Sequence, residues 1–211
     1  MNDNFLTLDE FNAARQKIES IFHVERRLPD QVFKQSYQFQ LLCEFDFAMV
    51  DVLETLRKTQ SPLAHESVLL SVLDPDPISF FYERFRKIYA FYFKANISED
   101  EHYHMRWREP GNEAKSFPFH TKLETYIPSS ASWAMWGESS REIAVIGLND
   151  PVLARFLVNE NGYWTDAETA LDDFASMPYR GQKVPEDFRH TLIANYGTKK
   201  DMEDKLGRSK R

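Results

Sequence analysis

The stretch "SASWAMWGESSREIAVIGL", Ser130–Leu148, decides the fold, because it contains two apolar runs separated by a short polar break. In an extended chain, Trp133 and Met135 point to one face and Trp136 points to the other. The second run repeats this arrangement, so both runs are apolar on both faces. Such a hairpin is typical of strands in the middle of a sheet. The sequence therefore predicts a central β-hairpin over residues 130–148.

The N-terminal segment predicts a helix. Thr7 and Glu10 have the spacing of a capping box, in which each side chain bonds to the backbone of the other residue. Leu6 and Phe11 stand at the staple positions around this box, and apolar residues then recur at helical spacing. We expect a helix over about residues 8–22.

The C-terminal third predicts further helices. The run "PVLARFL" has helical spacing of its apolar residues. A second helix is expected to open at the box formed by Thr165 and Glu168. A third is expected between Pro185 and Gly197, because proline favours the first position of a helix and glycine favours its end.

The segment "YQFQLLCEFDFAM" is ambiguous. Its apolar residues alternate, as in a strand, but apolar residues also recur at every fourth position from Phe33 to Leu53, as in a helix. A strand longer than about a dozen residues would be unusual, and no turn signal interrupts the segment. We expect one helix over about residues 30–58 and keep the strand as the alternative.

The remaining segments complete an α+β pattern. "SVLLSVLD" and "IYAFYFKA" predict strands, "ISFFYERFRK" predicts a helix, and a capping box at Ser98 and Glu101 predicts another; residues 109–122 are expected to form a loop. We expect a single α+β domain over residues 1–197. It would contain an antiparallel sheet with the 130–148 hairpin at its centre, flanked by N-terminal and C-terminal helices. Residues 198–211 are expected to form a polar, mildly basic and flexible tail.

The net charge of −7 limits the kinds of partner. The last fourteen residues are mildly basic, so the rest of the chain is more acidic than the total indicates. Nucleic-acid binders depend on lysine and arginine to neutralise phosphates. The composition therefore argues against nucleic acid as the primary partner, and it suits a basic protein partner.

Three features favour the cytoplasm. The single cysteine, Cys43, lies in an apolar run and has no second cysteine with which to form an internal disulfide. The N-terminal sequence lacks the pattern of a signal peptide. No segment has the roughly 18 uninterrupted apolar residues of a membrane span. We therefore expect a cytoplasmic protein with no membrane partner.

The histidines are the natural candidates for a metal site. His102 and His104 would share a face on a strand and could bind one ion with His120. The capping box just before them predicts a helix instead, on which residues two apart point in different directions. We therefore expect no metal ligands. A metal-assisted hydrolase that uses these histidines with nearby carboxylates is kept as the alternative function.

Signatures of other chemistry are absent from the sequence. "GESSR" lacks the second glycine of a nucleophile elbow, and the glycines are too far apart for a phosphate-binding or dinucleotide-binding loop. Cys43 has no flanking cation to stabilise a thiolate and is expected to be a core residue. We expect no catalytic residues and no cofactor.

Aromatic and charged residues are better candidates for a protein interface. Tryptophan, tyrosine and arginine are enriched at interface hot spots, because they combine a large area with a polar group. Trp133 and Trp164 are expected in the core, whereas Trp136, at the hairpin tip, is expected to be partly exposed. The residues expected to bind a partner are Arg106, Trp107, Arg108, Trp136, Glu138 and Tyr163.

These observations favour a non-catalytic protein that acts by binding another protein. An acidic domain without catalytic motifs would suit an inhibitor or immunity-type protein that neutralises a basic partner such as a toxin. A homodimer formed through the apolar hairpin is a further possibility.

Overall fold

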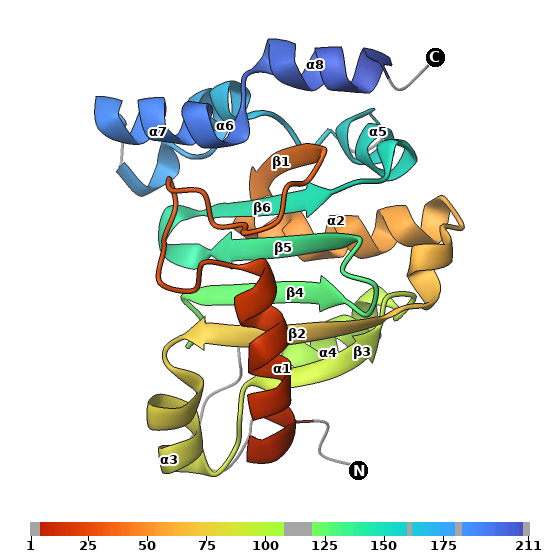
Figure 1. Ribbon diagram of the computed structural model, residues 1–211, viewed down its shortest axis with the longest axis vertical. Helices are drawn as coiled ribbons and strands as arrows, with labels where there is room; N and C mark the ends of the chain where they lie inside the picture. The colour runs from red at the N-terminus through yellow and green to blue at the C-terminus, as the bar shows by residue number, and fades with distance from the viewer. Residues whose placement is uncertain (1–4, 108–119, 160–161, 180–182, 209–211) are drawn as a thin grey trace.

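The computed structural model describes residues 5–107, 120–159, 162–179 and 183–208. These residues form one antiparallel sheet of six strands in the order β1-β6-β5-β4-β2-β3, with helices on both faces (Figure 1). The predicted α+β single-domain fold, with helices in both terminal regions, is confirmed. The strands are β1 (Phe39–Glu44), β2 (Ser67–Asp74), β3 (Ala90–Lys94), β4 (Leu123–Pro128), β5 (Trp133–Glu138) and β6 (Ile143–Leu148).

The hairpin of β5 and β6 lies inside the sheet, as predicted. Trp133 pairs with Leu148 and Trp136 pairs with Val145. The outer neighbours are β4 on one side and β1 on the other, so the hairpin offers no free strand edge to a second copy of the chain. Every residue of both strands is buried, because each face of the hairpin contacts one of the two hydrophobic cores.

The helices divide between the two faces of the sheet. Helix α1 (Leu8–Ile21) crosses one face, and Figure 1 shows it in front of the strands. The buried residues of α6 (Ala167–Asp173) and α7 (Glu186–Tyr196) extend the core on this side. The opposite core contains buried residues of α2 (Phe45–Lys58), α4 (Glu99–Arg106) and α5 (Pro151–Asn159).

The helix predicted over residues 30–58 is wrong in its first part. Residues 39–44 form β1, and the helix begins only at Phe45. Apolar residues that alternate also recur at every fourth position, so the spacing alone fits both a strand and a helix. The pairing of β1 with β6 decides in favour of the strand. The alternative considered for this segment, a strand, is thus confirmed for its middle part.

The predicted helix starts are largely confirmed. Thr7 and Ser98 cap α1 and α4, each in a full capping box. Pro185 and Gly197 flank α7 as expected. Helix α6 begins one residue later than predicted, and Asp166 caps it, because the backbone of Thr165 is bonded to Leu42 of β1.

The segments between and after these elements complete the description. β2 and β3 are confirmed, and a π-helical turn (Pro77–Tyr82) followed by α3 (Glu83–Phe85) connects them. Most of the loop expected over 109–122 lies outside the described residues. The segment expected to be a polar tail contains helix α8 (Lys199–Arg208), whose Met202 and Leu206 pack against the core on the α2 face. No helix in the described ranges has both the length and the apolar character needed to cross a membrane.

Candidate functional site

Two exposed aromatic rings lie where β1 runs into α2. Phe47, in the first turn of α2, is 47% exposed, and Tyr163, just before α6, is 51% exposed. The rings stack with their centroids 5.6 Å apart and an angle of 13° between their planes. Rings of this size are usually buried, and exposed apolar groups that gather at one place mark interaction surfaces. This pair is therefore the starting point of the candidate site.

Tyr163 is held in position by its neighbours in sequence. The side chain of Trp164 is buried in the core on the α2 face. The backbone of Thr165 exchanges two hydrogen bonds of 2.8 Å with Leu42 of β1. These contacts fix the segment against the edge of the sheet, so the Tyr163 ring is presented by a rigid support.

Three carboxylates lie near the start of α2. Glu44 ends β1, Asp46 lies in the first turn of α2, and Glu142 follows the turn between β5 and β6. The carbonyl oxygen of Glu142 accepts a hydrogen bond of 3.1 Å from the Phe45 N–H, which ties that turn to the start of α2. Partial burial raises the pKa of the Glu142 carboxyl, and the charges of Asp46 and Glu44 raise it further. The three carboxylates are thus close enough to create a shared negative potential.

Two hollows meet at Glu44. One, of about 240 Å³, is lined by Glu44, Tyr163 and Asp173 among others. The other, of about 480 Å³, is lined by Glu44, Glu142 and the half-exposed Met177 among others. We name six residues of this region the β1–α2 surface: Glu44, Glu142, Tyr163 and Met177, which line the hollows, and Asp46 and Phe47, which lie beside them in the first turn of α2.

A second cluster of polar groups is buried between α4 and the sheet. The Nη2 atom of Arg106 lies 2.9 Å from Oε2 of Glu124, and the hydroxyl of Tyr126 donates a hydrogen bond of 2.9 Å to Oε1. Burial raises the pKa of Glu124, and the guanidinium of Arg106 opposes this shift. Each oxygen of the buried Glu124 carboxylate has a side-chain partner, so the cluster fastens α4 to β4.

Glu138 forms another buried polar anchor, on the α1 face of the sheet. Its Oε1 atom accepts hydrogen bonds of 2.8 Å from the Leu28 N–H and from the indole N–H of Trp136. The prediction that Trp136 is partly exposed is wrong, since its side chain is fully buried and packs against Phe22 at 5.3 Å between ring centroids. Glu138 is 2% exposed. Burial removes the reason for assigning either residue to a binding surface.

Replacement of Glu138 by glutamine tests this anchor through its pH dependence. Burial raises the pKa of Glu138 above its ordinary 4.5, against the opposing hydrogen bonds from Trp136 and Leu28. Between the unfolded and folded pKa values the folded chain binds more protons, so the free energy of unfolding falls as the pH rises through that window. Glu138→Gln keeps an acceptor oxygen without the charge and is expected to remove this fall. Urea unfolding of both proteins across the window measures it, and parallel pH profiles would contradict the raised pKa.

The other predicted interface residues have different environments. Arg106 belongs to the buried cluster described above, and Arg108 lies outside the described residues. Trp107 is 39% exposed and lies against Tyr103, with ring centroids 5.5 Å apart. Tyr163 is on the β1–α2 surface. The assignment of these residues to a partner remains a prediction.

Sequence reasoning missed most of the β1–α2 surface. The patterns assigned Phe47 only to a strand or helix, and nothing in them marked Glu44 or Glu142. One signal was available, because Phe47 lies off the buried stripe of α2, whose apolar members are Ala48, Met49, Val52, Leu53 and Leu56. An aromatic residue on the polar side of an amphipathic helix is a candidate for contact.

The histidines diverge as the helical spacing predicted. On α4, His102 is buried and His104 is exposed. Burial lowers the pKa of His102 to about 3, and the charges of Arg106 and Arg57 contribute. Within the described part of the chain, no three histidine, cysteine or acidic side chains are grouped to hold a metal ion. Cys43 is buried in the core as expected, and burial raises the pKa of its thiol.

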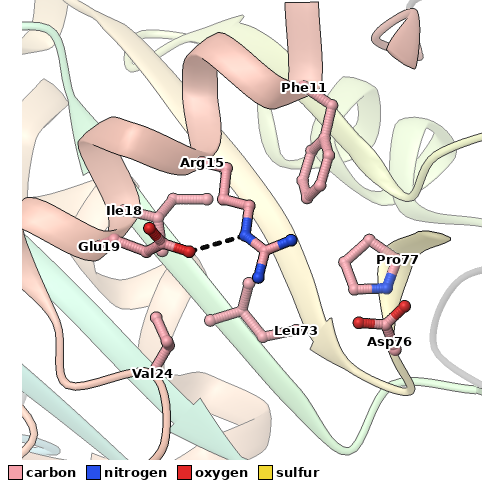
Figure 2. A pocket seen from close by; sticks show the side chains of 8 residues that line it. All are labelled: Phe11, Arg15, Ile18, Glu19, Val24, Leu73, Asp76 and Pro77. Carbon is pink, nitrogen blue, oxygen red and sulfur yellow. Dashed lines mark hydrogen bonds and ion pairs between the residues drawn. The ribbon is translucent and has the colours of Figure 1, made fainter. Parts of the chain in front are cut away.

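A further hollow lies between α1 and the end of β2. Figure 2 shows the Arg15 side chain extending across it and pairing with Glu19, at 2.7 Å. Its wall includes Phe11, Leu73 and Asp76. Its volume of about 170 Å³ is smaller than that of either hollow at Glu44, and the Arg15 side chain extends across it. We therefore place the candidate site at the β1–α2 surface.

The β1–α2 surface combines three features that the other described regions do not share. It has a stacked pair of half-exposed rings, a carboxyl group, that of Glu142, whose pKa is raised by burial and by the charges of Asp46 and Glu44, and two adjoining hollows. The exposed pair of Tyr103 and Trp107 borders on residues outside the described ranges. Comparison with protein-family models, with curated proteins and with solved structures gives no match to the chain.

Proposed function

We propose that this protein acts by binding another protein, one with a basic surface, through the β1–α2 surface. The observation that carries the proposal is the stacked, half-exposed pair of Phe47 and Tyr163 beside the carboxylates of Glu44, Asp46 and Glu142. Aromatic side chains supply large contact areas at interfaces. Carboxylates at the rim of such a contact select a partner of opposite charge and accelerate its approach.

The exposure of the rings favours a macromolecular partner over a small ligand. A small-molecule site usually encloses most of its ligand within a cavity. Phe47 and Tyr163 instead present about half of their surface to solvent. A contact that covers these rings together with both hollows needs a partner with an extended surface of its own.

The overall charge supports an inhibitory role. The net charge is −7, so long-range attraction would favour encounters with basic proteins. An inhibitor or immunity-type protein that covers a basic toxin is the role that fits these properties. Binding would then act by occluding the partner's working surface, without any reaction at the β1–α2 surface.

Removal of the aromatic pair tests the proposal. Phe47→Ala combined with Tyr163→Ala is expected to weaken partner binding by about thirtyfold or more, the size of an interface hot spot. The fold should be retained, because both side chains are half exposed. The partner is first isolated from the native cell with the wild-type protein and identified. Its affinity for each purified variant is then measured by calorimetry at two salt concentrations.

A matched control uses aromatic residues that are equally exposed elsewhere. Tyr92, on β3, is 45% exposed, and Tyr103, on α4, is 54% exposed. Replacing these two by alanine should leave the affinity within about twofold of the wild type. Equal losses in both double variants, or an affinity that does not fall with added salt, would count against the β1–α2 surface as the binding site.

A further inference from the structure

We infer that the β1–α2 surface is an arginine-binding site: the partner inserts an arginine side chain that stacks on the Phe47–Tyr163 pair and pairs with the carboxylate of Glu44. This inference rests on the proposed function and specifies which side chain the partner presents. It follows from the shape of the ring pair, from the position of Glu44 and from the chemistry that separates arginine from lysine.

Each ring of the stacked pair has one outer face, which is a flat apolar surface of the right kind. The planes of Phe47 and Tyr163 differ by only 13°, so the rings together form a nearly parallel stack. Each ring is about half exposed, which leaves ring surface available to a second molecule. A planar guanidinium stacks on such a face, and its weak hydration makes the loss of water less costly than for an ammonium group.

Glu44 is placed to take up the hydrogen-bonding edge of that guanidinium. It ends β1, three residues before Phe47, and lines the same hollow as Tyr163. A guanidinium donates its N–H bonds within its own plane, so it can stack on a ring and pair with a carboxylate at the same time. The charges of Asp46 and Glu142 add to the attraction, because a cation would relieve their mutual repulsion.

The same contact occurs within the protein itself. The guanidinium of Arg84 lies 4.5 Å from the ring centroid of Phe80, and that of Arg141 lies 5.3 Å from the ring centroid of Phe188. Among the cation–ring contacts of the described residues, none involves Phe47 or Tyr163. Since Phe47 and Tyr163 are each about half exposed, ring surface is accessible to an arginine from outside the chain.

Three short peptides test the inference directly. They are repeats of glycine with arginine, with lysine or with citrulline, which keeps the planar group of arginine but carries no charge. We expect the arginine peptide to bind about threefold more tightly than the lysine peptide, and the citrulline peptide to bind most weakly. Chemical-shift changes in an NMR titration should centre on the rings of Phe47 and Tyr163.

Variants of single carboxylates show whether the preference for the arginine peptide depends on pairing with Glu44 or only on the general negative charge of the protein. Glu44→Gln should reduce the preference for arginine over lysine. Glu54→Gln, two helical turns beyond Phe47 on the exposed side of α2 and paired with Lys58, should leave it unchanged. Equal binding of the arginine and lysine peptides, or shift changes centred elsewhere, would overturn the inference. If the purified partner still depends on Phe47 and Tyr163 in that case, the proposed function stands and only the arginine assignment fails. If the peptides behave as expected but the partner is insensitive to both rings, the proposed function fails instead.

Discussion

Replacement of Arg106 by alanine is expected to lower the free energy of unfolding by about 3–5 kcal/mol, the cost of removing one partner from a buried ion pair. Arg106 pairs with Glu124 at 2.9 Å, and the Glu124 side chain is only 2% exposed. Without the guanidinium, the carboxylate keeps one hydrogen bond, from Tyr126, and remains a buried charge. The loss reflects this unpaired charge more than the net value of the pair itself.

The loss should depend on pH in a defined direction. Burial already raises the pKa of Glu124, and removal of Arg106 takes away the cation that opposes the shift. A carboxyl group with a raised folded pKa stabilises the folded state most at low pH, so the deficit of the variant should shrink as the pH falls. Urea unfolding at several pH values measures both effects.

Two comparisons control the Arg106 experiment. Lys58→Ala breaks the exposed pair of Lys58 and Glu54, whose charged atoms lie 2.7 Å apart, and is expected to cost less than about 1 kcal/mol. A triple variant, Arg106→Met with Glu124→Leu and Tyr126→Phe, replaces the pair and the hydroxyl that bonds to it by apolar groups and should recover most of the stability. A loss in Arg106→Ala no larger than that in Lys58→Ala would contradict the structural role assigned to the buried pair.

Replacement of Trp136 by alanine is expected to cost about 3–5 kcal/mol in the free energy of unfolding, because it removes a large side chain from a packed core. The indole is fully buried and contacts the ring of Phe22. It also donates one of the two hydrogen bonds that Glu138 accepts. The variant therefore leaves both a cavity and a poorly satisfied buried carboxylate.

The control for Trp136 is a tryptophan that is partly exposed. Trp107 is 39% exposed, and Trp107→Ala should lower the free energy of unfolding by clearly less than Trp136→Ala. Thermal and urea unfolding of the two variants give the comparison. A stable Trp136→Ala protein that fails to bind its partner would show that this residue acts at a surface, in contradiction to its position in the core.

The parts of the fold that follow from local signals were predictable. The hairpin of β5 and β6 follows from apolar residues on both faces of two short runs, and these residues divide between the two cores. The capping boxes at Thr7 and Ser98 set the starts of two helices within a few residues. Such signals depend mainly on neighbours in sequence, and the box at Thr165 fails because the backbone of Thr165 is bonded to Leu42 of the distant strand β1.

The errors arise where distant contacts decide. The segment before Phe45 fits two periods equally well, and only its pairing with β6 makes residues 39–44 a strand. Trp136 stands near a glycine and a glutamate, which resembles an exposed hairpin tip. It is buried because α1 and the segment around Phe22 cover that end of the sheet, which spacing along the chain does not show.

The candidate site could be predicted only in part for the same reason. Tyr163 was selected as an aromatic residue beside a helix start, and it does lie on the β1–α2 surface. Its neighbours there come from the start of α2 and from the turn between β5 and β6, segments that are far apart in sequence. The arrangement of their carboxylates around the rings depends on the order of strands in the sheet, so no motif records it.

Hydrogen–deuterium exchange of the complex with the identified partner is the most direct test of the central claim that the β1–α2 surface binds a basic protein. We expect slower exchange, relative to the free protein, in the peptides that contain Glu44–Phe47, the turn at Ser139–Glu142 and the backbone next to Tyr163. The remaining surface should exchange as in the free protein. Protection centred on Tyr103 and Trp107 of α4, with no change at the β1–α2 surface, would contradict the claim.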